Sequence, residues 1–267
     1  MNDSSPAALG GPGYAEHPGH RVWLESCAKR VRALFNGETV VDSTAARLLY
    51  ETGRLPVYYF PIEDLRQDLL RPSDHGTSCP FKGEAAYWSI EVEGRRAENA
   101  VWGYPRPFRE VAGLEAYRAL AWSRMDRWLE EDEEVFVHAR DPHVRLDILD
   151  SSRRVEVVVG GETVAESRRA RFLFETALPV RYYLPQADVR WELLVPTARR
   201  SACPYKGRAR YWSVQAGGRL HEDLVWSYPD PLPESARIKD YLCFYNERVD
   251  AILVDGKVQP RPETKWS

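Results

Sequence analysis

Val31–Glu51 reads VRALFNGETVVDSTAARLLYE, and Val155–Glu175 reads VEVVVGGETVAESRRARFLFE. The second stretch starts 124 positions after the first, and the GETV core, most apolar positions and the final Glu of the two coincide. Self-similarity at one fixed shift is the signature of a duplicated structural unit. The sequence therefore predicts two tandem copies of one domain.

The same shift continues on both sides of this stretch. It superposes Pro72–Ile90 on Pro196–Val214, and Asn99–Pro107 on Asp223–Pro231. Both copies thereby contain the strings CPxKG, YW and WxYPxP. We expect a flexible leader rich in Gly, Pro, Ser and Ala at 1–16, a first repeat at 17–135, a connector that begins the second repeat at 136–150, the second repeat at 151–259 and a loose tail at 260–267.

Within each copy the local signals indicate mostly β structure. Asn36-Gly37 lies between two apolar runs and is typical of a type I′ hairpin turn, because both residues accept positive φ; Gly160-Gly161 takes the same place in the second copy. Further short apolar runs are separated by Pro and Gly. The fold class predicted is mostly β: two tandem copies of a small open-barrel or compact sheet domain with a few short helices.

One region gives conflicting signals in the two copies. Apolar residues recur at helical spacing over Leu114–Glu131, which predicts a helix there. The counterpart Tyr241–Val254 instead reads as a hairpin. Either one of the two interpretations is wrong or the copies have diverged at this place.

Composition excludes several classes of protein. With 43% hydrophobic and 29% charged residues and no apolar run of about 18 residues, the chain reads as a globular protein without a membrane partner. A net charge of -3 argues against a nucleic-acid partner, which requires a basic face. The N-terminal residues lack the features of a signal peptide, so we expect a cytoplasmic location and reduced cysteines.

Lysine and cysteine coincide in both copies. Only six lysines occur in the chain, and Lys82 and Lys206 are repeat-matched in the string CPxKG. Cys79 and Cys203 precede them by three residues, so each ammonium could favour a thiolate and make the cysteine a nucleophile. Alternatively, the cysteine is a small buried filler and the lysine covers an aromatic patch with its stem. These four residues are candidate catalytic residues, and the lysines are also candidate ligand-binding residues.

Aromatic residues form the second repeated cluster. Trp102 and Tyr104 lie two apart and should share one face of a strand, whereas Tyr87 and Trp88 should face opposite sides. Rings arranged in this way suit a planar or cationic small ligand, although they also serve as the largest apolar fillers of a small core. The predicted ligand-binding rings are Tyr87, Trp102 and Tyr104 in the first copy and Tyr211, Trp226 and Tyr228 in the second.

Acidic residues repeat at few positions. Glu51 and Glu175 are matched and are further catalytic candidates. If Ser43–Glu51 is extended, Ser43, Arg47 and Glu51 share a face, as a reactive set or merely with a cross-strand ion pair. Each copy has one aligned cysteine and no aligned histidine, which predicts no metal site. Neither a catalytic triad, a phosphate loop nor a dinucleotide fingerprint is present, so no cofactor is predicted.

Both copies resemble the domain-of-unknown-function family 427 through CPxKG, AxYW and WxYPxP. The resemblance covers nearly the whole chain after the leader and implies a compact, mostly β domain similar to tent-shaped β folds. Some classifications group that family with nucleotidyltransferase-like proteins, but neither clustered carboxylates nor a phosphate-binding glycine turn occurs here. The family pattern falls on Ser43, Glu51, Tyr59, Asp64, Cys79, Lys82, Gly83, Tyr87, Trp102 and Tyr104, and on Ser167, Glu175, Tyr183, Asp188, Cys203, Lys206, Gly207, Tyr211, Trp226 and Tyr228.

Two classes of function follow from these observations. The first is a cytoplasmic protein with an aromatic- and lysine-lined small-molecule pocket in each repeat, with or without an enzymatic activity. The alternative is a non-catalytic binding or structural module in which the two duplicated β domains pack against one another within the chain. The sequence favours the first class, but it does not identify the ligand, the reaction or the oligomeric state.

Overall fold

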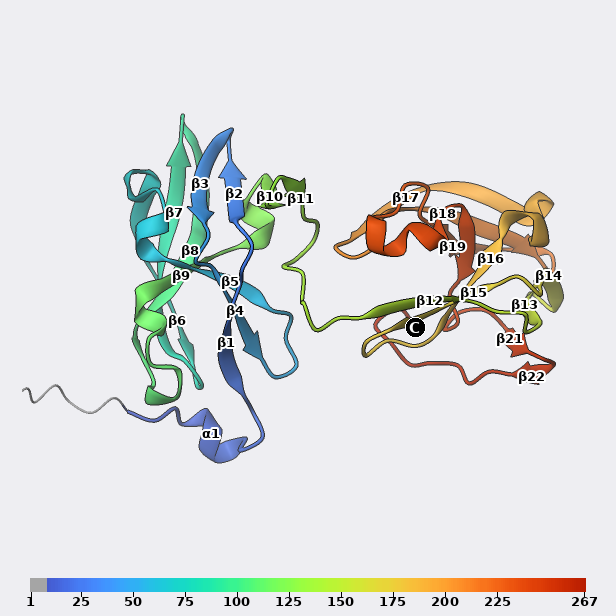
Figure 1. Cartoon of the computed structure of the whole chain (residues 1–267), viewed down its shortest axis with the longest axis horizontal. Helices are drawn as coiled ribbons and strands as arrows, with labels where there is room; N and C mark the ends of the chain where they lie inside the picture. The colour runs from blue at the N-terminus through green and yellow to red at the C-terminus, as the bar shows by residue number, and fades with distance from the viewer. Residues whose placement is uncertain (1–8) are drawn as a thin grey trace, which may run out of the picture. The chain divides into compact units, whose positions relative to one another are not determined.

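The computed structural model describes residues 9–267, which form two compact units divided between Asp141 and Pro142. Each unit contains one seven-stranded and one four-stranded antiparallel sheet (Figure 1). The strand order of the seven-stranded sheet is the same in both units, which confirms the duplicated, mostly β architecture. The division falls inside the segment 136–150 that the sequence assigns to the connector.

In unit 1 the seven-stranded sheet has the order β1-β4-β5-β9-β8-β7-β6 and the four-stranded sheet the order β11-β10-β2-β3. The strands are β1 (Val22–Ser26), β2 (Val31–Phe35), β3 (Glu38–Ser43), β4 (Arg47–Glu51), β5 (Val57–Pro61), β6 (Leu70–Cys79), β7 (Gly83–Val92), β8 (Arg95–Pro107), β9 (Tyr117–Leu120), β10 (Arg127–Glu130) and β11 (Glu133–Glu134). Short helices connect them: α1 (Gly13–Glu16), η1 (Ile62–Asp64), η2 (Gln67–Leu69), η3 (Arg109–Val111), η4 (Leu114–Ala116) and η5 (Trp122–Arg124).

In unit 2 the corresponding orders are β12-β15-β16-β20-β19-β18-β17 and β14-β13-β21-β22. The strands are β12 (Leu146–Asp150), β13 (Val155–Val159), β14 (Glu162–Ser167), β15 (Arg171–Glu175), β16 (Arg181–Pro185), β17 (Leu194–Cys203), β18 (Gly207–Ala216), β19 (Arg219–Ser227), β20 (Tyr241–Phe244), β21 (Ala251–Val254) and β22 (Lys257–Val258). The helical turns are η6 (Gln186–Asp188), η7 (Trp191–Leu193) and η8 (Pro233–Ile238).

The hairpins predicted from the turn residues are present. Asn36 and Gly37 join β2 to β3 with φ values of 50° and 84°, and Gly160 and Gly161 join β13 to β14 with φ values of 60° and 77°. Positive φ at both central positions is what a type I′ turn requires. These hairpins form part of the four-stranded sheets.

Alternation along the strands divides each seven-stranded sheet into two faces. On β5, Tyr58 and Phe60 belong to the core cluster that also contains Val31 and Trp128 of the four-stranded sheet. Tyr59, between them, belongs to a second cluster on the opposite face. The sheet therefore buries one face against its smaller partner and carries a separate set of side chains on the other.

The helix predicted over Leu114–Glu131 is wrong. That segment contains η4, β9, η5 and β10, and it crosses from the seven-stranded to the four-stranded sheet. Leu120, Met125 and Trp128 all reach the core between the sheets, from a strand, a turn and a second strand in succession. A chain that crosses between two layers can thus reproduce helical spacing without a helix.

The hairpin predicted over Tyr241–Val254 is also wrong. β20 pairs with β16 and β19 in the large sheet, while β21 pairs with β13 and β22 in the small one. β20 and β21 therefore occupy the positions of β9 and β10. The two copies agree in structure where their sequence signals differ.

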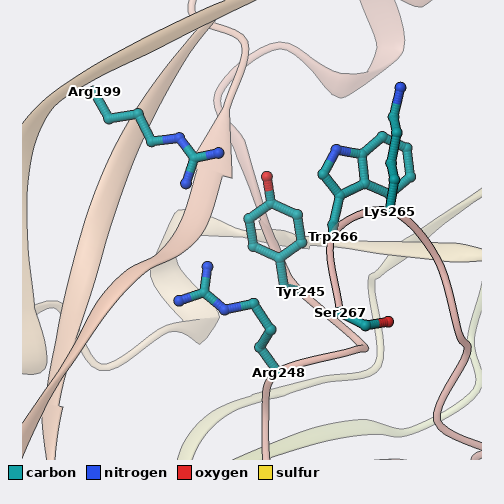
Figure 2. A pocket seen from close by; sticks show the side chains of 6 residues that line it. All are labelled: Arg199, Tyr245, Arg248, Lys265, Trp266 and Ser267. Carbon is teal, nitrogen blue, oxygen red and sulfur yellow. The ribbon is translucent and has the colours of Figure 1, made fainter.

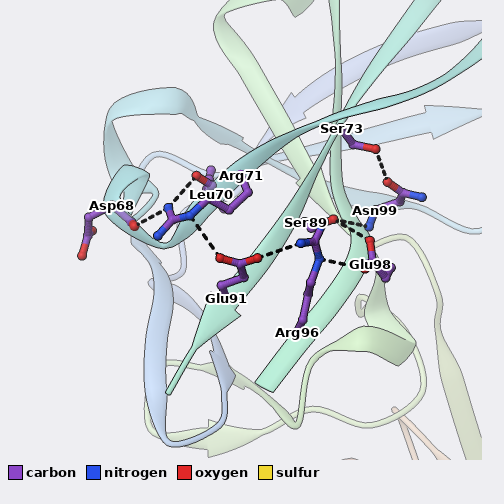
Figure 3. A network of polar contacts seen from close by, with 9 residues as sticks. All are labelled: Asp68, Leu70, Arg71, Ser73, Ser89, Glu91, Arg96, Glu98 and Asn99. Atoms are coloured by element: carbon purple, nitrogen blue, oxygen red, sulfur yellow. Dashed lines mark hydrogen bonds and ion pairs between the residues drawn. The ribbon is translucent and has the colours of Figure 1, made fainter. Parts of the chain in front are cut away.

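A polar network holds a bulge in the pairing of β7 with β8, between Trp88 and Ile90 (Figure 3). Asn99 has a φ of 51°, and its N–H donates to Ser89 Oγ at 3.1 Å. Ser89 Oγ donates in turn to Glu98 at 3.0 Å. In unit 2, Asp223 has a φ of 48° and donates from its N–H to Ser213 Oγ at 3.1 Å. The bulge is therefore a shared feature of the fold that the sequence patterns did not reveal.

Contacts extend into the expected leader and tail. Gly13 N–H donates to Pro80 O at 3.0 Å, and the Tyr14 ring lies 5.2 Å from that of Phe81. In unit 2, Thr264 Oγ1 donates to Glu247 at 2.7 Å. The sequence gives no signal of these contacts. Among the residues described, no helix has the length and apolar character needed to traverse a bilayer.

Candidate functional site

The second face of each seven-stranded sheet is lined with aromatic rings, and we call it the ring face. In unit 1 the Trp102 indole N–H donates to the Tyr59 hydroxyl at 3.2 Å, with the rings edge-to-face. Trp226 and Tyr183 repeat this bond at 3.2 Å in unit 2. The ring face carries Tyr59, Tyr87, Trp102, Tyr104 and Tyr117 in unit 1, and Tyr183, Tyr211, Trp226, Tyr228 and Tyr241 in unit 2.

The matched lysines lie at an edge of the ring faces and are ion-paired. Lys82 is 6% exposed, and its ammonium donates to Glu51 Oε2 at 2.5 Å. The same nitrogen lies 5.9 Å from the Tyr104 ring centroid. In unit 2, Lys206 is 7% exposed and donates to Glu175 Oε2, also at 2.5 Å. The structure therefore brings together the lysine and carboxylate candidates of each copy.

This ion pair bridges distant parts of one sheet. Lys82 sits in the turn from β6 to β7, while Glu51 ends β4, and β5, β9 and β8 lie between β4 and β7. In a flat sheet four strand spacings amount to about 19 Å, several times the reach of a lysine side chain. The sheet must therefore curl toward the ring face, which is its concave side. We call the Lys82–Glu51 and Lys206–Glu175 ion pairs the clasps, because each joins two parts of one curled sheet that are four strands apart in the strand order.

Glu51 has additional partners near the N-terminal segment. His20 Nε2 lies 3.2 Å from Glu51 Oε1, and the His20 ring stacks on Phe81 with 3.6 Å between centroids. Arg54 Nε approaches the other carboxylate oxygen at 3.5 Å. For Glu175, Lys206 is the only side-chain partner within the described part of the chain. The two clasps thus share the lysine–glutamate ion pair, but only Glu51 has further side-chain partners among the described residues.

The cysteine and serine candidates occupy different places. Cys79 and Cys203 end β6 and β17 as half-buried free thiols, and the hydrogen bonds of the nearby ammonium groups go to the carboxylates described above. Ser43 ends β3 in the other sheet, where its hydroxyl accepts the Ala45 N–H. Arg47 donates to the Tyr117 hydroxyl at 2.8 Å. The expected Ser43-Arg47-Glu51 surface is wrong, because the chain changes sheets between β3 and β4. Arg47 and Glu51 both lie on β4, and the expected pair between them is not formed because each bonds to other side chains.

The comparison with protein families agrees with this duplicated site. A family model described as NTP_transf_9, domain of unknown function (DUF427), matches residues 23–131 and 147–255. The chain belongs to the DUF427 family. Each match spans one unit with its clasp and ring face. The search of the curated proteins found no match.

Burial sets the protonation state of the tyrosine hydroxyls in these DUF427 domains. Burial raises the pKa of Tyr59 and Tyr104, and that of Tyr183 and Tyr228 in unit 2. Their hydroxyls are therefore neutral across the physiological range. They can donate and accept hydrogen bonds, but none of them supplies a phenolate base.

Unit 2 covers its ring face with residues that unit 1 lacks. Arg181 donates to both carboxylate oxygens of Glu247, at 2.7 and 2.6 Å, and both side chains are nearly inaccessible. The Arg181 guanidinium lies 5.6 Å from the Trp226 ring centroid and 5.5 Å from that of Trp266. Trp226 is consequently 7% exposed, whereas its counterpart Trp102 is half-buried. The positions matching Arg181 and Glu247 are Val57 and Ser123 in unit 1, so neither residue could be found by comparing the repeats.

Two surface cavities lie in unit 2. One, of about 300 Å³, is lined by Arg145, Asp147, Phe174, Glu175, Thr176, Leu178 and Val180. Its Phe174 and Asp147 are cross-strand partners, and strand alternation directs them away from the face that carries Leu173 and the Glu175 side chain. This cavity therefore adjoins Glu175 and is lined in part by side chains of the face opposite the ring face.

The second cavity, of about 240 Å³, is lined by Arg199, Tyr245, Arg248, Lys265, Trp266 and Ser267 (Figure 2). Its Tyr245 ring packs 4.5 Å from that of Trp226, so this cavity borders the covered ring face of unit 2. Within residues 9–267, no three His, Cys, Asp or Glu side chains are grouped as a metal site would require.

Proposed function

We propose that this DUF427 protein binds a small planar molecule at the ring face of unit 1. The observation that carries the proposal is the difference in cover between equivalent rings. Tyr87 and Trp102 remain half-buried on a concave face, whereas their counterparts Tyr211 and Trp226 are buried in unit 2. Concave surfaces with accessible aromatic rings favour stacking with a flat ligand.

The clasp gives the lysines a positioning role in this proposal. Lys82 keeps the sheet curled by its bond to Glu51, and its ammonium lies beside the Tyr104 ring. A ligand that used this amine directly would have to separate a buried ion pair, which is costly. The rings Tyr87, Trp102 and Tyr104 therefore supply the contact surface, with Lys82 fixing its shape. The equivalent Tyr211, Trp226, Tyr228 and Lys206 support the fold of unit 2.

The alternative is a non-catalytic structural module in both units. It is favoured by the commitment of Lys82 and Lys206 to ion pairs and by the participation of the rings in apolar clusters. In that case the two repeats serve mainly to pack with one another or with a partner. The absence of ligand binding at the ring face of unit 1 would establish this reading.

A matched pair of variants distinguishes the two readings. A library of planar aromatic fragments is screened against the full chain by saturation-transfer NMR, and hits are measured again with Tyr87→Leu and Tyr211→Leu. The proposal expects Tyr87→Leu to weaken binding about tenfold or more, the size of one lost ring contact, and Tyr211→Leu to leave it unchanged. Equal effects of the two variants, or a screen without hits, contradict the proposal.

A further inference from the structure

The cavity lined by Arg199, Tyr245 and Arg248 concentrates positive charge. Figure 2 shows both guanidinium groups on one side of the Tyr245 ring, with Trp266 and Lys265 on the other. Within residues 9–267, one carboxylate, that of Asp223, comes within 4 Å of these cations, at 3.6 Å from Arg199.

Arg248 is held in place by groups that do not neutralise it, whereas Arg199 also contacts the Asp223 carboxylate. Arg248 donates to the backbone oxygens of Glu222 and Asp223, at 2.7 and 3.4 Å. Arg199 stacks over the Tyr211 ring at 4.6 Å, in addition to its contact with Asp223. Carbonyl oxygens and ring faces orient a guanidinium while leaving its full charge available. The cavity is thus preorganised for an anion before any anion arrives.

Comparison of the units shows that the fold does not require this pair of cations. The positions matching Arg199 and Tyr245 are His75 and Ala121 in unit 1, which builds the same sheets without them, whereas Arg248 is matched by Arg124. Like charges placed close together destabilise a folded protein unless something compensates them. An external anion would supply that compensation.

We propose that this cavity binds the phosphate group of a small phosphorylated molecule. Two guanidinium groups match the geometry of phosphate oxygens, and the double negative charge of a phosphate monoester suits more than one cation. The volume of about 240 Å³ is below the roughly 300–1,000 Å³ of drug-sized sites, which restricts the organic part to a few atoms. Trp266 and the Tyr245 hydroxyl border the space for that part. This site is independent of the function proposed for unit 1.

The test uses methyl phosphate as the probe and the full chain as the protein. Isothermal titration at fixed ionic strength should show saturable binding, which Arg199→Gln and Arg248→Gln each weaken about tenfold or more. Arg145→Gln is the matched control: Arg145 is an exposed arginine of unit 2, hydrogen-bonded to Asp147, and its loss changes the net charge equally. Both cavity arginines are largely exposed, so thermal melting should show that the variants stay folded.

Three outcomes would overturn the proposal. Binding that does not saturate, equal weakening by Arg145→Gln, or acetate binding as tightly as methyl phosphate each removes the case for a phosphate site. Tyr87→Leu in unit 1 should leave methyl phosphate binding unchanged. Failure of the planar-ligand screen therefore does not affect this result, and failure here does not affect that screen.

Discussion

Separating the Lys206–Glu175 clasp should destabilise unit 2 strongly. The side chains are 9% and 7% exposed and their charged atoms are 2.5 Å apart, so Lys206→Met leaves a carboxylate buried without its cation. Removing one partner of a buried pair costs about 3–5 kcal/mol in free energy of unfolding, which for a unit of this size lowers Tm by roughly 10–20 °C. The double variant Lys206→Met/Glu175→Leu should recover most of this loss, because no unpaired charge remains.

Urea unfolding of the wild type, Lys206→Met, Glu175→Leu and the double variant completes the cycle. Arg190→Met is the control, because Arg190 forms exposed ion pairs with Glu192 and Glu162 and its loss should cost less than about 1 kcal/mol. A double variant destabilised by the sum of the two single effects would show that the residues do not act as a pair. Single variants as mild as the control would refute the clasp.

The remaining predictions concern the other buried groups of unit 2. Burial opposes the Glu247 carboxylate, but hydrogen bonds from Arg181 and Thr264 outweigh it and hold the pKa of Glu247 below its ordinary value of 4.5. This group therefore stabilises the fold above about pH 4.5, and its contribution is lost as the pH falls through its folded pKa. Denaturant unfolding from pH 7 to 3 should show that Glu247→Gln has a lower free energy of unfolding than the wild type, by an amount that decreases in acid. The exposed Glu263→Gln should show no such difference. Burial raises the pKa of the Cys243 thiol to about 12. Iodoacetamide at pH 7.5 should therefore label Cys79 and Cys203 and leave Cys243 unmodified, as measured by peptide mass spectrometry. Labelling of native Cys243 at a similar rate would contradict its burial.

Local sequence signals predicted the repeated elements well because both copies carry them. The Asn36-Gly37 turn needs positive φ at two adjacent residues, and few residue types allow it, so the hairpin could be recognised directly. The opposite orientations expected for Tyr87 and Trp88 follow from strand periodicity and match their separate clusters. Composition placed the chain among globular proteins, and the turn residues and short apolar runs indicated the mostly β fold.

Contacts between residues far apart in the chain could not be predicted from the sequence. Lys82 meets Glu51 because the sheet curls, and neither residue type nor spacing reports that curvature. Leu120, Met125 and Trp128 mimic a helix because the chain crosses between two layers. Arg181 and Glu247 pair across 66 positions in one copy only, so the comparison of repeats that revealed the fold passed over them.

The most direct test of the proposed site observes the two equivalent indoles at once. Trp102 and Trp226 each donate a hydrogen bond to a tyrosine hydroxyl at 3.2 Å, but only Trp102 is on an accessible ring face. Their indole N–H signals are assigned with Trp102→Phe and Trp226→Phe, and a planar fragment hit is titrated into the ¹⁵N-labelled wild-type chain. We expect a saturable shift of the Trp102 signal and no change at Trp226. A shift at Trp226 with Trp102 unmoved, or no shift at either indole, would contradict a ligand site on the ring face of unit 1.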